Sequence, residues 1–244
     1  MPIGHPTCTH PILVFMDFKQ VRLITFDCYG TLIDWESGIL RALRPLFAGV
    51  SDDQLLKLYS EIEPEIQSAS YLPYRTVLGR AVEQIGQRLN RKVLPAEAEA
   101  FAESLKQWQP FPDTVAALHI LARHYKLGII SNIDDDLFAA TNKLLDTSFD
   151  LIVTAQQVRS YKPSLSNFYE AIKRAGNAGI RKEEILHAAE SRHHDIAPAS
   201  ALGLKNVWVN RRFGKEGGGA TRASEATPGL EVHNVAELAD LLIR

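Results

Sequence analysis

The chain has 244 residues, of which 45% are hydrophobic, and this length suits one core domain with a smaller inserted domain. Its 27 Lys and Arg residues nearly balance its 29 Asp and Glu residues, and the net charge of −2 offers no basic field for nucleic acid. The longest apolar stretches are strand-sized, well below the roughly 20 residues that cross a bilayer, so no membrane partner is expected.

The two cysteines, Cys8 and Cys28, are too few for a disulfide framework and favour a reducing compartment. Residues 1–15 lack the basic start and the cleavage region of a secretory signal peptide. We therefore expect a cytoplasmic protein whose first 19 residues form a disordered leader.

Five apolar runs recur along the rest of the chain, each followed by a polar or glycine-bearing stretch and then by helical periodicity. The runs cover residues 21–26, 127–130, 151–153, 185–189 and 207–209. Such alternation of strand and helix is typical of an α/β fold with a doubly wound parallel sheet. Residues 20–35 and 110–244 are therefore predicted to form an α/β core domain.

A long insertion with helical periodicity separates the first apolar run from the second. Apolar residues share one helical face over 39–47 and another over 77–89, and Pro95 begins a further helix that stops near Pro110. The pattern predicts a helical cap domain over residues 36–109. Beyond the second run, the three aspartates at 134–136 are expected to stabilise the positive end of the next helix.

Polar side chains follow four of the predicted strands. Asp27 follows the first run, Ser131 the second and Asp195 the fourth, while Lys162 lies in the loop after the third. Taken alone, each is more often a turn residue, a helix cap or a solvated side chain. Ligands of an open parallel sheet bind beyond the carboxyl ends of its strands, near the point where strand order reverses. These four side chains are therefore expected to converge on one site.

Four motifs, in this order, carry a resemblance to a known family: Phe26–Leu32, Ile130–Asn132, Ser160–Pro163 and Ala189–Asp195. With them the chain resembles the haloacid dehalogenase superfamily from Val21 to the C-terminus, and it looks most like the type II 2-haloacid dehalogenase branch. The resemblance implies a Rossmann-like core, a helical cap inserted after the first motif, and hydrolase activity.

By this resemblance, Asp27 is the nucleophile, which displaces a leaving group and forms an aspartyl ester that water then cleaves. Lys162 supplies the cation that lowers the pKa of Asp27, and Asp195 orients Lys162 and the hydrolytic water. Ser131 donates a hydrogen bond to the substrate. The other residues expected to contact a small acidic substrate are Tyr29, Thr31, Asn132 and Ser191.

Position 29 bears on the type of reaction. Phosphatases of this superfamily place an aspartate two residues after the nucleophile, because an alkoxide leaving group must be protonated as it departs. This chain has Tyr29 there, with an ordinary pKa of about 10, and chloride or bromide leaves without a proton. We therefore predict cleavage of the carbon–halogen bond of short 2-haloalkanoic acids without a required cofactor. The alternative is a degenerate phosphatase in which the Tyr29 ring only packs.

One departure from the family pattern concerns the arginine with which the dehalogenases receive the halide in the early cap. Residues 59–67 align with that stretch and contain three glutamates and no arginine. A substitute from elsewhere in the cap is the alternative, although an arginine on an amphipathic helix is more often its solvated edge. The candidates are Arg41, Arg44, Arg75 and Arg80.

The fourth motif also departs, since Arg192 stands where the dehalogenases place an asparagine. Glu190 and Asp195 instead keep the spacing of magnesium-dependent relatives, and with Asp27 they would hold Mg²⁺ in a magnesium-dependent enzyme. In an enzyme that does not use magnesium, Lys162 and Arg192 would balance the negative charges of these three carboxylates. A magnesium-dependent phosphatase of small metabolites and a weakly active metabolite-binding protein stay open as functions, and a homodimer stays open as the assembly.

Overall fold

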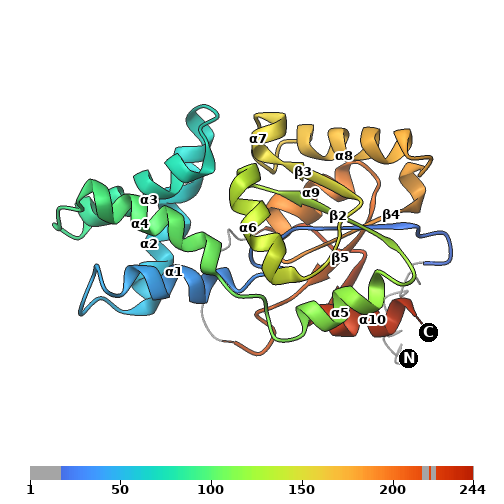
Figure 1. The fold of residues 1–244 in the computed structure, drawn as a ribbon, viewed down its shortest axis with the longest axis horizontal. Coiled ribbons are helices and arrows are strands. Elements are labelled where there is room, and N and C mark those ends of the chain that lie inside the picture. Colours follow the sequence, from blue (N-terminus) through green and yellow to red (C-terminus); the bar gives the residue numbers. More distant parts are fainter. Residues whose placement is uncertain (1–17, 216–219, 221–223, 244) are drawn as a thin grey trace, which may run out of the picture.

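The computed structural model describes residues 18–215, 220 and 224–243, so residues 1–17 of the expected leader lie outside the described residues. One six-stranded sheet has the order β3-β2-β1-β4-β5-β6, and every neighbouring pair is parallel (Figure 1). The predicted α/β fold with a doubly wound parallel sheet is confirmed. The strands are β1 (Leu23–Phe26), β2 (Lys126–Ser131), β3 (Leu151–Thr154), β4 (Ile185–Ala189), β5 (Lys205–Val209) and β6 (Leu230–Val232).

Helices cover both faces of the sheet, and successive strand residues point to opposite faces. Leu23 of β1 packs with α8 (Ser166–Asn177) and α9 (Ala197–Ala201) in one core. Ile24 packs in a second core with α5 (Thr114–Leu121), α6 (Asp135–Leu145) and α10 (Val235–Leu242). Short helical turns complete the connections: α7 (Ala155–Val158), η2 (Lys182–Glu184) and η3 (Arg192–Ile196).

Four further helices lie together at one end of the molecule, away from the sheet (Figure 1). They are α1 (Trp35–Leu43), α2 (Asp52–Ala69), α3 (Tyr74–Arg88) and α4 (Pro95–Ser104), followed by the turn η1 (Leu105–Gln107). We refer to residues 35–107 as the α1–α4 segment. Its buried side chains, such as Ile39 and Phe101, belong to the same hydrophobic cluster as Ile24 of the sheet.

The order of the strands places the reversal point at β1. The chain runs from β1 outward through β2 to β3, then crosses to the other side of β1 and continues through β4, β5 and β6. Phe26, the last residue of β1, lies beside Ile129 of β2 and Ala188 of β4. The residue that follows it therefore emerges where a parallel sheet of this order binds ligands.

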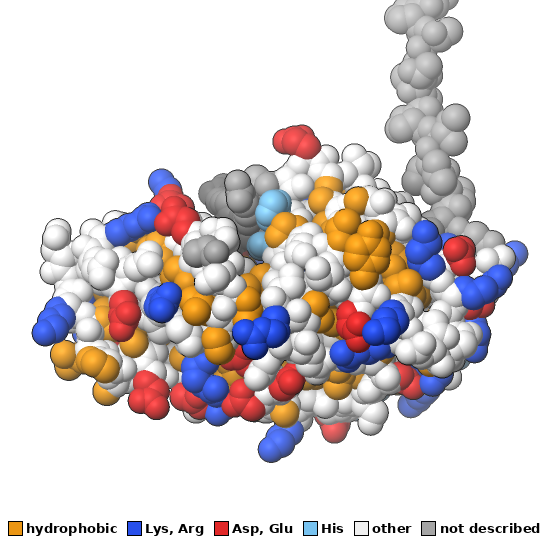
Figure 2. Space-filling view, turned by 90° about the horizontal axis from the view of Figure 1, so that it is seen from above, with side chains coloured by type: hydrophobic (Ala, Val, Ile, Leu, Met, Phe, Trp, Pro, Cys, Tyr) orange, Lys and Arg blue, Asp and Glu red, His pale blue; other side chains and the backbone are white. Residues whose placement is uncertain are grey.

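The surface carries charges of both signs. Figure 2 shows Lys and Arg side chains interspersed with Asp and Glu side chains over the face in view, in keeping with the net charge of −2. Of the helices in the described residues, none combines the length and the apolar character needed to span a lipid bilayer.

Candidate active site

Asp27 is the first residue after β1, at the reversal point of the sheet. Its backbone N–H donates a hydrogen bond to the carbonyl oxygen of Ala188 at 3.1 Å, which holds it to the end of β4. The chain then turns sharply at Gly30, whose φ of +97° is in a region that side chains disfavour. The Asp27 side chain is 10% exposed, so it is enclosed but reachable.

Lys162 joins Asp27 to Asp195. Its Nζ donates hydrogen bonds to Asp27 Oδ1 at 2.8 Å, to Asp195 Oδ1 at 2.6 Å and to the carbonyl oxygen of Ile130 at 2.8 Å. The three donors of the ammonium group are thereby all used. The side chains of Lys162 and Asp195 are each 1% exposed, so the ammonium group is fixed between two carboxylates.

This arrangement shifts the pKa values of all three groups. Burial raises the pKa of Asp27 above its ordinary value, because it outweighs the lowering by Lys162, and the charge of Asp195 raises it further. Burial opposes ionisation of Asp195 as well, but Lys162 and His187 hold its pKa below the ordinary value. The two aspartates keep the pKa of Lys162 raised in spite of its burial. Lys162 thus lowers the pKa of Asp27 as expected, although the net shift is upward.

Thr31 and Asn132, both predicted to contact the substrate, form hydrogen bonds with the loops that carry Asp27 and Lys162. The Thr31 hydroxyl donates to Asp27 Oδ2 at 2.9 Å, accepts from the backbone N–H of Glu190 at 2.8 Å, and is fully buried. The Asn132 amide pairs with the backbone of Lys162, accepting from its N–H at 2.7 Å and donating to its carbonyl at 3.1 Å. Asn132 also lines the pocket, whereas Thr31 is not among the residues that line it.

Two buried oxygen atoms beside Asp27 have no hydrogen-bond partner among the described residues. They are Ser131 Oγ and Asp195 Oδ2, and both residues line the pocket. A buried polar atom without a partner is costly, so these positions favour a polar ligand. Asp195 itself is held from behind, because His187 Nε2 donates to Asp195 Oδ1 at 3.0 Å while Thr25 contacts His187 Nδ1 at 2.9 Å.

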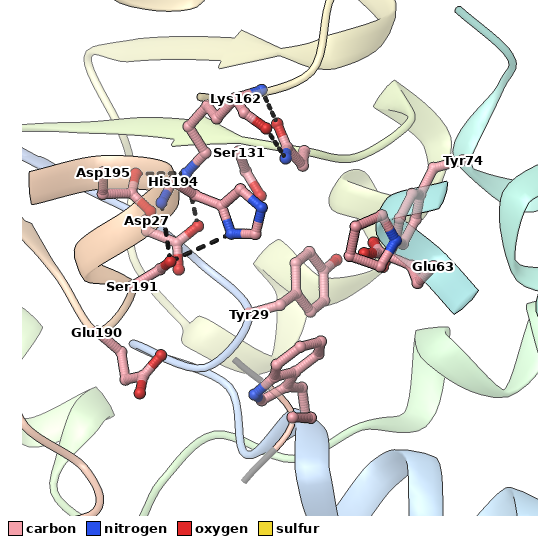
Figure 3. A pocket seen from close by; sticks show the side chains of 14 residues that line it. Asp27, Tyr29, Glu63, Tyr74, Ser131, Lys162, Glu190, Ser191, His194 and Asp195 are labelled. Carbon is pink, nitrogen blue, oxygen red and sulfur yellow. Dashed lines mark hydrogen bonds and ion pairs between the residues drawn. The ribbon is translucent and has the colours of Figure 1, made fainter. Parts of the chain in front are cut away.

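A pocket lies beside Asp27, lined both by residues at the carboxyl edge of the sheet and by residues of the α1–α4 segment. Tyr29 lines it, with its hydroxyl bound to the Thr141 hydroxyl at 2.8 Å and its ring edge against Trp108. Ser191 also lines it, and its hydroxyl accepts from the His194 backbone N–H at 3.0 Å. Figure 3 shows Asp27, Ser131, Lys162 and Asp195 around the pocket, with two further side chains, Glu63 and Tyr74, on its far side.

The arginines considered as substitutes in the cap do not reach this pocket. None of the four is among its lining residues in the described part of the chain, so none of them replaces the missing arginine at this pocket. Arg44 pairs with Asp52, and Arg75 pairs with both Glu103 and Asp136; the other two, Arg41 and Arg80, are exposed.

Arg192, which was expected to balance the charges of Asp27, Asp195 and Glu190 together with Lys162, contacts other groups. Its guanidinium group lies over the Trp208 ring, 5.1 Å from the ring centroid, and it donates to the carbonyl oxygen of Ser224. Lys162 is therefore the cation that contacts Asp27 and Asp195.

Comparison with known proteins places this geometry in a family. The sequence profile of haloacid dehalogenase-like hydrolases matches residues 21–203, which include all four motifs. The chain belongs to the haloacid dehalogenase-like hydrolase family. The recognition that the motifs suggested is thereby confirmed, and the protein is a hydrolase.

Three relatives of this hydrolase illustrate the range of the family. The chain is 28% identical over 242 residues to an (S)-2-haloacid dehalogenase of Pseudomonas putida, covering 92% of this chain and 98% of the relative. It is 29% identical over 201 residues to a phosphoglycolate phosphatase of Photorhabdus laumondii, covering 78% and 81%. Its fold is similar to the structure of L-2-haloacid dehalogenase from Xanthobacter autotrophicus with chloropropionic acid covalently bound, with a TM-score of 0.78, 18% identity and coverage of 91% and 98%.

The magnesium ligands considered for this hydrolase are not gathered around one position. Asp27 and Asp195 each direct an oxygen at Lys162 Nζ, and the Glu190 side chain points away from both (Figure 3). Across the described residues, no group of three or more His, Cys, Asp or Glu side chains is arranged to hold a metal ion. The three carboxylates therefore do not fit a shared ion.

Sequence reasoning missed several residues of this hydrolase's site. His187 is a lone polar residue within the buried strand β4, and that contrast was the signal for it. Glu63 was noted only as one of three glutamates, without a reason to select it. Asp134 was expected at the next helix, but its carboxylate accepts from the backbone N–H groups of Tyr74 and Arg75 at 2.8 and 2.9 Å. It therefore caps α3, across the junction with the α1–α4 segment.

Proposed function

We propose that this hydrolase removes halide from short 2-haloalkanoic acids through an ester on Asp27. The observation that carries the proposal is Tyr29 at the position where a phosphatase needs an acid. Burial raises the pKa of Tyr29 well above 10, and its hydroxyl is engaged with Thr141, so it is a far poorer general acid than the aspartate of a phosphatase. A halide leaves without a proton. The similarity to (S)-2-haloacid dehalogenase of Pseudomonas putida supports the same substrate class.

In the first step, the Asp27 carboxylate attacks carbon 2 of the substrate and the halide departs with the electron pair of the carbon–halogen bond. Thr31 and Lys162 each hold one carboxylate oxygen, which fixes the direction of attack. Ser131 Oγ, buried and without a protein partner in the described residues, donates to the substrate carboxylate. Ser191 and Asn132, at the same pocket, complete the polar surroundings of that carboxylate.

In the second step, water cleaves the ester and frees Asp27. Asp195 Oδ2 is buried beside Lys162 and accepts no hydrogen bond from the described residues. In the proposal this oxygen orients the hydrolytic water, while Lys162 and His187 hold Asp195 in place from the side of Oδ1. Neither step calls for a cofactor, because the halide needs no Lewis acid to depart and the nucleophile is a protein carboxylate.

The proposal extends to the organisation of the molecule. Residues 36–109 act as a cap that closes the pocket over a core made of residues 20–35 and 110–244. Glu63 and Tyr74 line the pocket from the cap side, which supports this division. A cytoplasmic location, supported by the buried free thiol of Cys28, and assembly as a homodimer belong to the same proposal.

The test is release of chloride from 2-chloropropionate and chloroacetate. Wild type is expected to release chloride, and Asp27→Asn at least about 10³-fold more slowly, because the amide is not a nucleophile. Asp52→Asn, which alters an exposed aspartate paired with Arg44, is the control and should match wild type. Wild type that releases no more chloride than Asp27→Asn refutes the proposal. Magnesium-stimulated release of phosphate from phosphoglycolate, with no chloride release, would establish the phosphatase instead.

A further inference from the structure

The wall of the pocket that faces Asp27 comes from the α1–α4 segment. Glu63 lies on α2, Tyr74 begins α3 and Trp35 begins α1, and all three line the pocket. Figure 3 shows Asp27 on one side of the pocket and Glu63 and Tyr74 on the other. The Tyr29 side chain is drawn between the two sides. Displacement at carbon proceeds from the face opposite the departing group. A leaving group displaced by Asp27 therefore moves toward this wall.

Glu63 differs from the two other glutamates in the same stretch of α2. Glu61 and Glu65 pair with Arg88, at 2.8 and 3.5 Å, and face solvent. Glu63 is 8% exposed and accepts a hydrogen bond from Gln67 Nε2 at Oε1, and no cation of the described residues pairs with it. A carboxyl group buried beside a pocket without a cation favours its neutral form, which carries a donor O–H.

Among the side chains of this wall, Glu63 is the one whose pKa lies near neutral pH. Burial raises the pKa of Glu63 to about 7, and the Tyr74 hydroxyl offsets part of this effect. Burial likewise raises the pKa values of the tyrosines around it, which stay neutral in this range: Tyr29, Tyr59, Tyr74 and Tyr161. The charged or titratable side chains on the other walls of the pocket are Asp27, Lys162, Glu190, His194 and Asp195.

We propose that the protonated Glu63 carboxyl receives the departing halide, with the Tyr74 hydroxyl beside it, and the inference rests on the proposed function. As the ester bond to Asp27 forms, the carbon–halogen bond breaks and its electron pair leaves with the halide. The halide accepts a hydrogen bond from the Glu63 O–H. The proton stays on Glu63, because chloride and bromide are far weaker bases than a carboxylate. Ionised Glu63 repels the halide instead, so the reaction slows as Glu63 loses its proton.

The first test compares the pH profile of wild type with that of Glu63→Gln. The control is Glu61→Gln, on the same helix but facing solvent. From a pKa of about 7, the protonated fraction of Glu63 falls about 30-fold between pH 6 and 8.5, and kcat/KM for 2-chloropropionate should fall equally in wild type and Glu61→Gln. Glu63→Gln keeps a neutral amide donor at every pH, so its kcat/KM should vary less than about threefold. A 30-fold fall that persists in Glu63→Gln would overturn the proposal.

Bromide binding provides a second test that needs no turnover. Trp35 lines the same pocket, so bromide bound there should quench its fluorescence, and a Trp35→Phe variant gives the background from the other tryptophans. Wild type is expected to bind bromide about 30-fold more tightly at pH 6 than at pH 8.5, in proportion to the protonated fraction of Glu63, and Glu63→Gln equally at both. Bromide binding of this kind without any halide release would reject the proposed function and keep the halide site. Halide release with bromide binding that is independent of pH would reject only the halide site.

Discussion

Replacing Lys162 with methionine removes the cation between two buried carboxylates and preserves much of the side chain's volume. In wild type, the Lys162 ammonium group lies 2.8 Å from Asp27 Oδ1 and 2.6 Å from Asp195 Oδ1. Its loss leaves two carboxylates facing each other, with the His187 imidazole as the remaining partner of Asp195. Breaking a buried ion pair from one side costs about 3–5 kcal/mol, so we expect Lys162→Met to lower the free energy of unfolding by that amount near pH 8.

The cost should depend on pH, and its sign follows from linkage. Without Lys162, burial and mutual repulsion raise the pKa values of Asp27 and Asp195 in the folded state above those of the unfolded chain. A raised folded pKa contributes stability that is fully present below the unfolded pKa and is lost as pH rises through the folded pKa. In wild type the pKa of Asp195 is instead held low. The destabilisation by Lys162→Met should therefore be larger at pH 8 than at pH 5.

Urea denaturation followed by circular dichroism at both pH values measures this effect. Lys126→Met is the control, because the Lys126–Asp150 pair has a similar distance of 2.8 Å but is half exposed, and its loss should cost at most about 1 kcal/mol. Adding Asp195→Asn to Lys162→Met should restore part of the lost stability, since one buried charge disappears. A Lys162→Met variant that is destabilised equally at pH 5 and pH 8, or by less than Lys126→Met, would refute the reasoning.

Two further variants probe the loops around the nucleophile. Thr31→Val should lower the free energy of unfolding by about 1–3 kcal/mol, because it leaves the partly buried N–H of Glu190 without its hydrogen bond to Thr31, and should slow halide release by freeing Asp27. Thr31→Ser, which keeps the hydroxyl, is the control in both assays. Asp134→Ala should cost about 1 kcal/mol in urea denaturation, because it removes the side chain that caps α3, and should raise KM. Asp136→Ala, an exposed neighbour, is its control.

These expectations fail on distinct results. If Thr31→Val and Thr31→Ser have the same stability and the same rate, the Thr31 hydroxyl does not hold the nucleophile loop. If Asp134→Ala is no less stable than Asp136→Ala and binds substrate equally well, the hydrogen bonds from the start of α3 to the Asp134 carboxylate do not hold the α1–α4 segment against the sheet. Each variant is compared with a control variant of similar size, so the conclusion depends on the difference in stability or activity between the two and not on either value alone.

Much of the fold and of the pocket is predictable from the sequence, because both depend on short-range patterns. Apolar runs of strand length predict the strands, and the rule for parallel sheets brings Asp27 and Lys162 to the same edge without reference to packing. The strand β6 has only three residues and carries no such run. For that reason it was not predicted.

The residues that the sequence did not select act through packing between distant elements. Three glutamates at alternate positions of one helix cannot all face the same side, and only the packing of α2 selects Glu63 as the buried one. Asp134 contacts Tyr74, 60 positions away in the chain. Propensity and periodicity describe a segment and its own neighbours, so a hydrogen bond of this kind is beyond them.

The hydrophobic cluster that joins the sheet to the α1–α4 segment constrains how this enzyme can be re-engineered. The cluster runs from Ile24 in β1 through Trp108 to Ile39 in α1, and Gly38 lies so close to Trp108 that an added Cβ would come within 2.3 Å of its ring. A chimera that receives the α1–α4 segment from a relative must therefore also receive the sheet residues that pack against it in this cluster. Otherwise the graft exposes apolar surface on both partners and removes the packing contacts between them.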